Sequence, residues 1–233
     1  MTGRQVGARA VIPLFPLGTV LVPGLVLPLH IFEPRYRRLM ADLQTRRDDD
    51  RAFGVVAVRE GWEVGEEGVT AMYDVGTLAV VREMVPYPDG RFDVVTNGDA
   101  RFRILSLAES DAPYLMAEVE WLAEDAPGDD AEAAILSAGV GRRFDTYRAA
   151  VAAAGAVEAA QMADLPDDPR ILSYLVAVAM VLDLSDRQLL LEAATTTDRL
   201  RIEVALLARE TMLMTELPSL PAVDLARTIS GLN

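Results

Sequence analysis

The chain has 233 residues, 51% of them hydrophobic, and a formal net charge of −14 at pH 7. This length is enough for one large domain or two small ones with a full apolar core. The sequence contains no cysteine, which excludes disulfides, thiolate catalysis and cysteine-rich zinc sites. All 22 basic residues are arginine, so no lysine can form a Schiff base or a Ser–Lys dyad. The acidic balance opposes binding to nucleic acid or to anionic membranes.

The sequence shows no sign of a targeting or membrane segment. The first residues lack the apolar core of a signal peptide. No apolar run approaches the roughly 18–20 residues that cross a bilayer. We therefore expect a cytoplasmic protein.

The first part of the chain is a series of short apolar runs that are separated by proline and glycine. Runs of this length and punctuation predict strands of a small, sharply curved sheet. The predicted strands are Val11–Phe15, Thr19–Val22 and Leu25–Ile31. Glu33-Pro34 then predicts the start of a helix over about residues 34–46, because proline is tolerated at the first helical position. Its apolar face is formed by Tyr36, Leu39, Met40 and Leu43, at a spacing of three and four residues.

The central part predicts further strands that are joined by tight turns. The expected strands are Ala52–Arg59, Gly76–Val85, Phe92–Thr96, Ala100–Leu107 and Tyr114–Leu122. Pro88-Asp89-Gly90 and Asn97-Gly98 have the composition of tight turns, and Glu60–Val69 that of a surface loop. In the last strand, Leu115, Ala117, Val119 and Trp121 alternate with polar residues, which indicates one buried and one wet face. Many short strands with tight turns predict a small barrel.

After residues 123–130, whose composition marks a linker, the periodicity becomes helical. We expect helices over residues 131–154, capped by Asp129 with Glu132, and from Asp168-Pro169 to Leu182. A third helix should be capped by Ser185 with Gln188 and end near Ala194, and a fourth should run from Thr197 to about Leu217. The predicted class is α+β. It has a β-rich lobe (residues 1–122) containing one helix, a linker (123–130) and a C-terminal helical-bundle lobe (131–233).

Motifs for catalysis, nucleotide binding or metal binding are missing from the sequence. His30 is the single histidine, so HExxH is excluded, and neither a GxSxG elbow nor a GxxxxGK[ST] or GxGxxG loop occurs. We expect no catalytic residue, no cofactor and no metal. For His30, one interpretation is a structural histidine that bonds to nearby backbone, and the other is a ligand contact.

A few aromatic and charged residues are candidates for binding. Burial in the core competes with a binding role for Phe32 and Tyr36. Trp62 lies in a polar, glycine-rich loop, where a large apolar residue usually covers something. Tyr87 lies beside the Pro-Asp-Gly turn, and Glu33 with Arg35 can form an ion pair at the helix start.

At several of these segments the chain resembles a known family. The stretch Pro13–Met40, PLFPLGTVLVPGLVLPLHIFEPRYRRLM, is similar to the opening of the N-terminal domain of Lon proteases. This domain is their substrate-recognition part, and small stand-alone bacterial proteins share it. The resemblance continues through Tyr73–Ala79, Pro88–Arg91, Ala100–Ile104 and Tyr114–Val119. It implies a PUA-like β-barrel for the first lobe.

The resemblance implies recognition without proteolysis. Lon proteases carry an ATPase segment and a Ser–Lys protease domain after this part, whereas this sequence ends at Asn233 and has no lysine. We expect a non-catalytic module that binds polypeptide, either an unfolded segment or a partner protein. The cleft between barrel and helices is the expected site, with an exposed strand edge as a further means of binding. The candidate contacts are His30, Phe32, Glu33, Arg35, Tyr36, Trp62 and Tyr87.

Two other functions remain open from the sequence. The same cleft could hold a small molecule, which would make the protein a sensor or a minor enzyme. RNA binding, by analogy with other PUA-like barrels, is the third hypothesis, and the acidic charge disfavours it. The sequence does not specify the oligomeric state.

Overall fold

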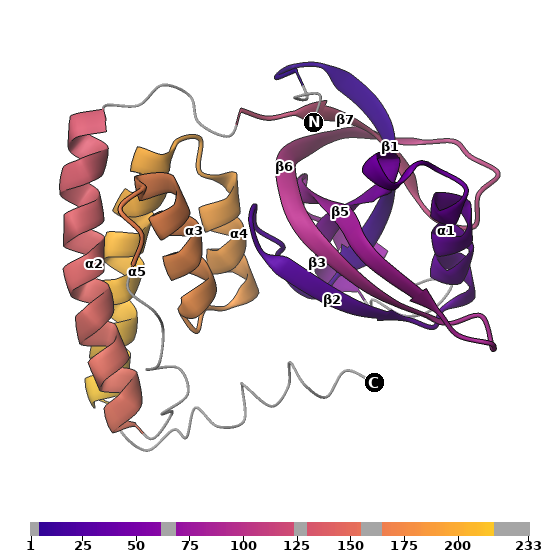
Figure 1. The fold of residues 1–233 in the computed structure, drawn as a ribbon. Helices are drawn as coiled ribbons and strands as arrows, with labels where there is room; N and C mark the ends of the chain where they lie inside the picture. Colours follow the sequence, from indigo (N-terminus) through magenta and orange to yellow (C-terminus); the bar gives the residue numbers. More distant parts are fainter. Residues whose placement is uncertain (1–4, 62–68, 124–129, 155–164, 217–233) are drawn as a thin grey trace. The chain divides into compact units, whose positions relative to one another are not determined.

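The computed structural model describes residues 5–61, 69–123, 130–154 and 165–216 (Figure 1). Its strands are β1 (Arg9–Leu17), β2 (Val26–Ile31), β3 (Ala52–Gly61), β4 (Val69–Met72), β5 (Val75–Pro86), β6 (Phe92–Ala108) and β7 (Met116–Trp121). Its helices are α1 (Pro34–Gln44), α2 (Asp130–Ala153), α3 (Pro169–Ala179), α4 (Leu184–Glu192) and α5 (Thr196–Glu216), with a 3₁₀ turn at Asp48–Asp50. The predicted α+β class is confirmed.

The chain divides into two compact units. Met1–Glu124 together with Asp183–Glu192 form the first, which we call the barrel unit. Asp125–Leu182 together with Ala193–Asn233 form the second, which we call the helical unit. Helix α4 therefore groups with the strands, although α3 and α5 on either side of it in the sequence do not.

The barrel unit consists of a sheet that closes on itself. Its strands follow the order β1-β7-β6-β5-β3-β4, β2 pairs with β6, and β1 also pairs with β3. The β1–β3 pairing is parallel and places Leu14 opposite Gly54, whereas the other pairings are antiparallel. Closure gives most strands a partner on both sides, which protects their backbone groups.

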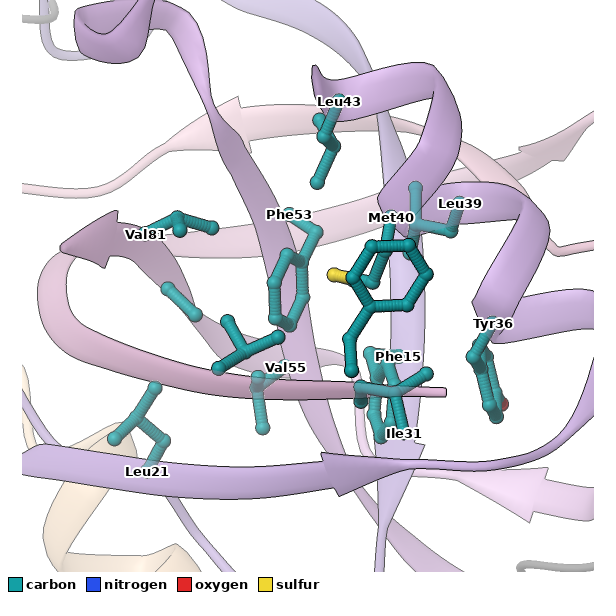
Figure 2. Close-up of a cluster of buried hydrophobic side chains, with 13 residues drawn as sticks. Phe15, Leu21, Ile31, Tyr36, Leu39, Met40, Leu43, Phe53, Val55 and Val81 are labelled. Carbon is teal, nitrogen blue, oxygen red and sulfur yellow. The ribbon is translucent and has the colours of Figure 1, made fainter. Parts of the chain in front are cut away.

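Helix α1 covers one apolar cluster of the barrel unit (Figure 2). All four residues of its predicted apolar face are buried: Tyr36, Leu39, Met40 and Leu43. They meet Phe53, which is fully buried, and Phe15, whose ring stacks on Tyr36 with centroids 4.0 Å apart. The three- and four-residue spacing of the sequence therefore predicts this helix and its buried face correctly.

A second apolar cluster surrounds Phe102 in the same unit. The ring of Trp121 meets the Phe102 ring edge-on, with centroids 6.2 Å apart. Ala117, Val119 and Trp121 are buried along β7, and the residues between them are partly exposed. The predicted alternation of this strand is confirmed.

The hairpin predicted at Asn97-Gly98 is wrong, because β6 runs without interruption from Phe92 to Ala108. The backbone of Gly98 is approached closely by the segment before β2. Gly98 N–H donates to Leu25 O at 2.8 Å, and Gly24 N–H donates to Gly98 O at 2.9 Å. A Cβ at position 98 would lie 2.2 Å from Val22 O. Glycine is therefore required here for close packing rather than for a turn.

The strand predicted at Thr19–Val22 is a buried loop instead. Val20, Leu21 and Val22 are all buried, although they pair with no described strand. The hydroxyl of Thr77 donates to Leu21 O at 2.6 Å, which satisfies one buried carbonyl of the loop. The apolar pattern predicts the burial of this segment correctly but not its conformation.

The turn predicted at Pro88-Asp89-Gly90 is confirmed. Gly90 has a φ of 84°, and its N–H donates to Tyr87 O at 2.9 Å. Arg37 of α1 donates from Nε to Gly90 O and from Nη2 to Asp89 O, both at 2.7 Å. Helix α1 therefore holds the β5–β6 turn in place.

The helix starts follow the predicted pattern only in part. Asp168 caps α3 as expected, because its Oδ1 accepts from the N–H groups of Arg170 and Ile171. Helix α4 is capped by Asp183 rather than Ser185, since Asp183 Oδ1 accepts from Asp186 N–H at 2.8 Å. Helix α5 begins at Thr196, one residue before the predicted start, and the hydroxyl of Thr195 accepts from Asp198 N–H at 3.0 Å. The predicted cap of α2, Asp129, lies outside the described residues.

Helix α4 is bound to the barrel by long-range hydrogen bonds. Gln188 Nε2 donates to Val75 O at 3.0 Å. The buried guanidinium of Arg101 donates to Leu191 O and to Ala123 O, each at 2.7 Å. Gln188 and Arg101 are both almost fully buried. These side chains explain why α4 belongs to the barrel unit.

Candidate functional site

Strands β2, β6 and β5 place several predicted site residues on one side of the sheet. In the register, His30 lies opposite Asp93, and Asp93 lies opposite Val85. Residues that face one another in antiparallel strands point to the same side. The alternate residues Ile31, Phe92 and Val94 are buried on the other side, in the cluster that α1 covers. This three-stranded part thus has an inner face toward α1 and an outer face away from it.

The outer face carries large apolar side chains that remain exposed. The exposed fraction is 53% for Val26, 45% for Phe32, 45% for Val85 and 38% for Tyr87. Pro28 is exposed between them on β2. We define the outer face by Val26, Pro28, His30, Phe32, Val85 and Tyr87. An exposed apolar surface of this kind commonly marks a binding site.

A hydrogen-bonded cluster orients the rings of the outer face. His30 Nδ1 lies 2.6 Å from Asp93 Oδ1, and the Tyr87 hydroxyl donates to Asp93 Oδ2 at 2.5 Å. His30 Nε2 lies 3.3 Å from Arg91 Nη1. The rings of His30 and Tyr87 meet edge-on, with centroids 6.1 Å apart. Asp93 thereby fixes the two rings relative to each other.

These hydrogen bonds shift two pKa values. Hydrogen bonds from Tyr87 first and from His30 second lower the pKa of Asp93. The same contact with Asp93 raises the pKa of Tyr87, because it stabilises the protonated phenol beside a carboxylate. Tyr87 therefore remains a neutral donor at physiological pH.

The predicted site residues divide into four groups, one of which is the Glu33–Arg35 ion pair described below. His30, Phe32 and Tyr87 lie together on the outer face. Tyr36 is 4% exposed and belongs to the core. Trp62 lies outside the described residues.

Two interpretations from the sequence are corrected by this placement. The His30 side chain is 43% exposed and bonds to the side chains of Asp93 and Arg91, not to nearby backbone. Phe32 is 45% exposed, so its interpretation as a core residue is wrong. Its ring lies beside His30, with centroids 6.5 Å apart.

Glu33 and Arg35 form the predicted ion pair at the start of α1. Arg35 Nη2 lies 2.9 Å from Glu33 Oε2, and both side chains are mostly buried. The Arg35 guanidinium carbon lies 4.7 Å from the centroid of the Tyr36 ring. The pair therefore packs over the buried tyrosine and shapes the N-terminus of α1.

The sequence gives no warning of two hollows beside α1. One, of about 290 Å³, is lined by Arg35, Tyr36 and the connection between β6 and β7. The other, of about 470 Å³, is lined by five residues, among them Arg38 and Asp42. Tyr114 lines the first hollow and packs against the core cluster, and its hydroxyl donates to Asp42 Oδ2 at 2.9 Å. Burial first, and then this bond, raise the pKa of Tyr114.

The helical unit contains a buried carboxyl group, Glu203, which is not among the site residues predicted from the sequence. Glu203 is fully buried on α5, and none of the described residues donates a hydrogen bond to its carboxyl. Burial raises the pKa of Glu203 well above its ordinary value, and the charge of Arg199 opposes this only in part. The available signal was its position, since Leu200, Glu203 and Leu207 follow the spacing of one helix face.

The described residues contain neither a metal-type cluster of side chains nor a helix that could cross a membrane. Within residues 5–61, 69–123, 130–154 and 165–216, no three or more His, Cys, Asp or Glu side chains gather as a metal site would require. None of the helices in those ranges is both long and apolar enough to cross a bilayer.

Comparison with known families assigns the chain to a class of binding domain. Residues 11–209 match the model of the ATP-dependent protease La (LON) substrate-binding domain. This match covers most of the chain. The protein therefore belongs to the Lon substrate-binding domain family.

Individual relatives are Lon proteases. Over 205 residues the chain is 30% identical to Lon protease of Escherichia coli (strain K12), which covers 87% of this chain and 25% of that protein. Lon protease of Anaeromyxobacter dehalogenans is 28% identical over 205 residues, which covers 86% of this chain and 23% of that protein. The chain thus spans about a quarter of the length of these relatives.

Solved structures support the same fold. The Lon N-terminal domain protein from Xanthomonas campestris aligns with a TM-score of 0.59 at 22% identity, covering 84% of this chain and 98% of that one. The N-terminal domain of Mycobacterium avium complex Lon protease aligns with a TM-score of 0.61 at 20% identity, covering 85% and 98%.

Proposed function

We propose that this chain is a non-catalytic recognition module that binds polypeptide, as an unfolded segment or a partner protein, through the outer face. Family membership supports recognition, because the matched model is a substrate-binding domain. The observation that carries the location is the contiguous row of exposed Phe32, His30 and Tyr87 beside Val85. Aromatic residues that remain exposed in a fixed orientation are typical anchors of protein interfaces.

The chemistry of the outer face fits a largely apolar stretch of polypeptide. Phe32, Val26 and Val85 offer apolar area, and the hydroxyl and ring nitrogens of the cluster offer a polar rim. Burial of one such side chain contributes on the order of 1.5–3 kcal/mol at most, so two or three are needed for measurable affinity. The cleft between barrel and helices and the cytoplasmic location both stay predictions.

The small-molecule alternative draws less support. The larger of the two hollows beside α1 has Arg38, Asp42 and Asp111 among its five lining residues, whereas small-molecule sites are mostly apolar with a few polar groups. RNA binding is opposed by the net charge of −14.

The test compares binding of chemically unfolded proteins to three forms of the chain by crosslinking and by fluorescence anisotropy. The double variant Phe32→Ser and Val85→Ser should bind about tenfold more weakly than the unaltered chain. Val11→Ser is the matched control, because Val11 is 58% exposed on β1 and lies outside the outer face. Unaltered chain that captures no more unfolded protein than an unrelated acidic protein would overturn the proposal. Equal weakening by the control would overturn the location.

A further inference from the structure

Strand β2 has one edge that no described strand covers. It pairs with β6 alone, outside the closed path of the barrel. Gly98 N–H donates to Leu25 O, and the register places Val26 opposite Asn97. In an antiparallel pair, hydrogen-bonded and non-hydrogen-bonded positions alternate. The backbone groups of Val26, Pro28 and His30 therefore point away from β6.

Two apolar side chains of β2 are only partly buried at this edge. Leu27 and Leu29 are partly buried and pack against the core cluster that α1 covers. Because they lie on the last strand of the inner face, a further strand would complete their burial. Alternate residues of such a strand would lie beside Val26 and His30 on the outer face.

The opposite edge of the same three-stranded part is less suited to pairing. The β3–β5 register ends at Val80, and after Val81, whose N–H donates to Arg51 O at 2.9 Å, β5 pairs with no described strand on that side. Arg82 and Glu83 are exposed there, and the β5–β6 register shifts between Val81 and Glu83. Exposed charges and bulges are the means by which proteins protect a strand edge.

We propose that β2 binds an extended polypeptide segment as an added strand, an inference that rests on the proposed function and gives it a binding mode. The segment alternates apolar residues, which cover Leu27 and Leu29, with uncharged or basic ones. The charge preference follows from the net charge of −14. A second copy of this chain carries the same charge and is the less favourable partner.

Pro28 limits the strength of this pairing. Proline has no N–H, so the outward donors of the edge are Val26 and His30, whereas Val26, Pro28 and His30 all present carbonyl groups. A proline in the middle of an open edge also opposes edge-to-edge aggregation. The edge is therefore open to a suitable segment but binds it weakly. Weak binding suits a recognition module, because such a module must also release its substrate.

The first test uses a synthetic peptide of about nine residues that alternates valine with lysine or threonine. Two further versions carry N-methyl groups on alternate residues, one version on the odd and one on the even positions. Methyl groups on the side facing β2 remove hydrogen bonds and clash, whereas those on the far side do not. One methylated version should bind at least about tenfold more weakly than the parent, and the other should bind as the parent does.

The second test restores the missing donor. Pro28→Val should tighten binding of the parent peptide about threefold to tenfold, the effect of one added hydrogen bond. Pro86→Val, the same substitution at the end of the opposite edge on β5, should leave binding unchanged. A circular dichroism melt checks that both variants fold.

The outcomes separate this inference from the proposed function. Binding of the parent and of both methylated versions with equal affinity would overturn strand addition and leave side-chain recognition intact. Failure of the parent peptide and of unfolded proteins to bind at all would overturn both. If the unaltered chain forms dimers through this edge and binds no peptide, the edge pairs with a second copy and the inference is wrong.

Discussion

The inner and outer faces of β2, β5 and β6 are built from alternate residues of the same strands, yet they differ in how deeply their side chains are buried. Ile31, Phe92 and Val94 face inward and are buried beneath α1. His30, Asp93 and Val85 face outward and are partly or largely exposed. The inner face stabilises the barrel, and the outer face is available for binding. A single alternating pattern thus produces both a buried core and an exposed, partly apolar surface.

The largest expected effect lies at the centre of the inner cluster. Phe53→Ala removes a fully buried ring and leaves a cavity, so it should lower the free energy of unfolding by about 3–5 kcal/mol. Urea unfolding followed by circular dichroism measures it. Val85→Ala on the outer face is the control and should change stability by less than about 0.5 kcal/mol. Similar losses for the two variants would contradict the distinction between the faces.

A smaller loss is expected where the loop before β2 crosses β6. Gly98→Ala places a Cβ 2.2 Å from Val22 O, and the resulting displacement should cost on the order of 1–3 kcal/mol. Gly139→Ala is the matched control, since a Cβ there meets nothing within 4 Å inside helix α2. It should stabilise the chain by about 0.5–1 kcal/mol. Thermal melts in which Gly98→Ala and Gly139→Ala shift the melting temperature in the same direction would argue against the close approach at Gly98.

Arg37 links helix α1, which covers the inner face, to the β5–β6 turn, which follows Tyr87 of the outer face. Arg37→Ala removes two hydrogen bonds to Gly90 O and Asp89 O and should cost about 1 kcal/mol, since the contact is partly exposed. Arg37→Lys should recover only part of this, because an ammonium cannot reproduce the planar fork. Arg38→Ala, whose partner Asp42 lies on the same helix, serves as the control. If Arg37→Ala and Arg37→Lys both lower stability no more than Arg38→Ala does, Arg37 does not hold the β5–β6 turn in solution.

The smallest effect concerns the polar cluster of the outer face. The pKa of Asp93 is lowered in the folded protein, so its ionised form stabilises the fold above its ordinary pKa. This contribution disappears as the pH falls through the lowered value. The unfolding midpoint of the unaltered chain should therefore fall slightly more steeply below about pH 4 than that of Asp93→Asn. Parallel curves for the two proteins would show that Asp93 does not make these contacts in solution.

The sequence predicts the features that depend on local spacing. Helix α1 and its buried Tyr36 follow from three- and four-residue periodicity, and the turn at Gly90 follows from its Pro-Asp-Gly sequence. The alternation in β7 likewise requires only neighbouring residues. Each of these signals lies within a window of about a dozen residues.

The features that the sequence could not predict depend on distant partners. Asn97-Gly98 has the composition of a hairpin, but contacts with Val22 and Leu25, more than seventy residues away in sequence, keep it in a continuous strand. Helix α4 groups with the barrel through Gln188, whose partner Val75 is 113 residues away.

The candidate site shows the same division. His30, Phe32 and Tyr87 can be selected from the sequence as unusual residues. Their common location and the role of Asp93, which is 63 residues from His30, require the strand register. Alternation of Asp93 with the buried Phe92 and Val94 was the local signal that it points outward.

The most direct test places a photoreactive amino acid at Val85 on the outer face or at Val11 on β1, two exposed positions of the barrel unit. Each protein is irradiated with the same unfolded polypeptide, and covalent adducts are quantified by mass spectrometry. Our account predicts abundant adducts from position 85 and few from position 11. Equal yields at the two positions, or none at position 85, would contradict it.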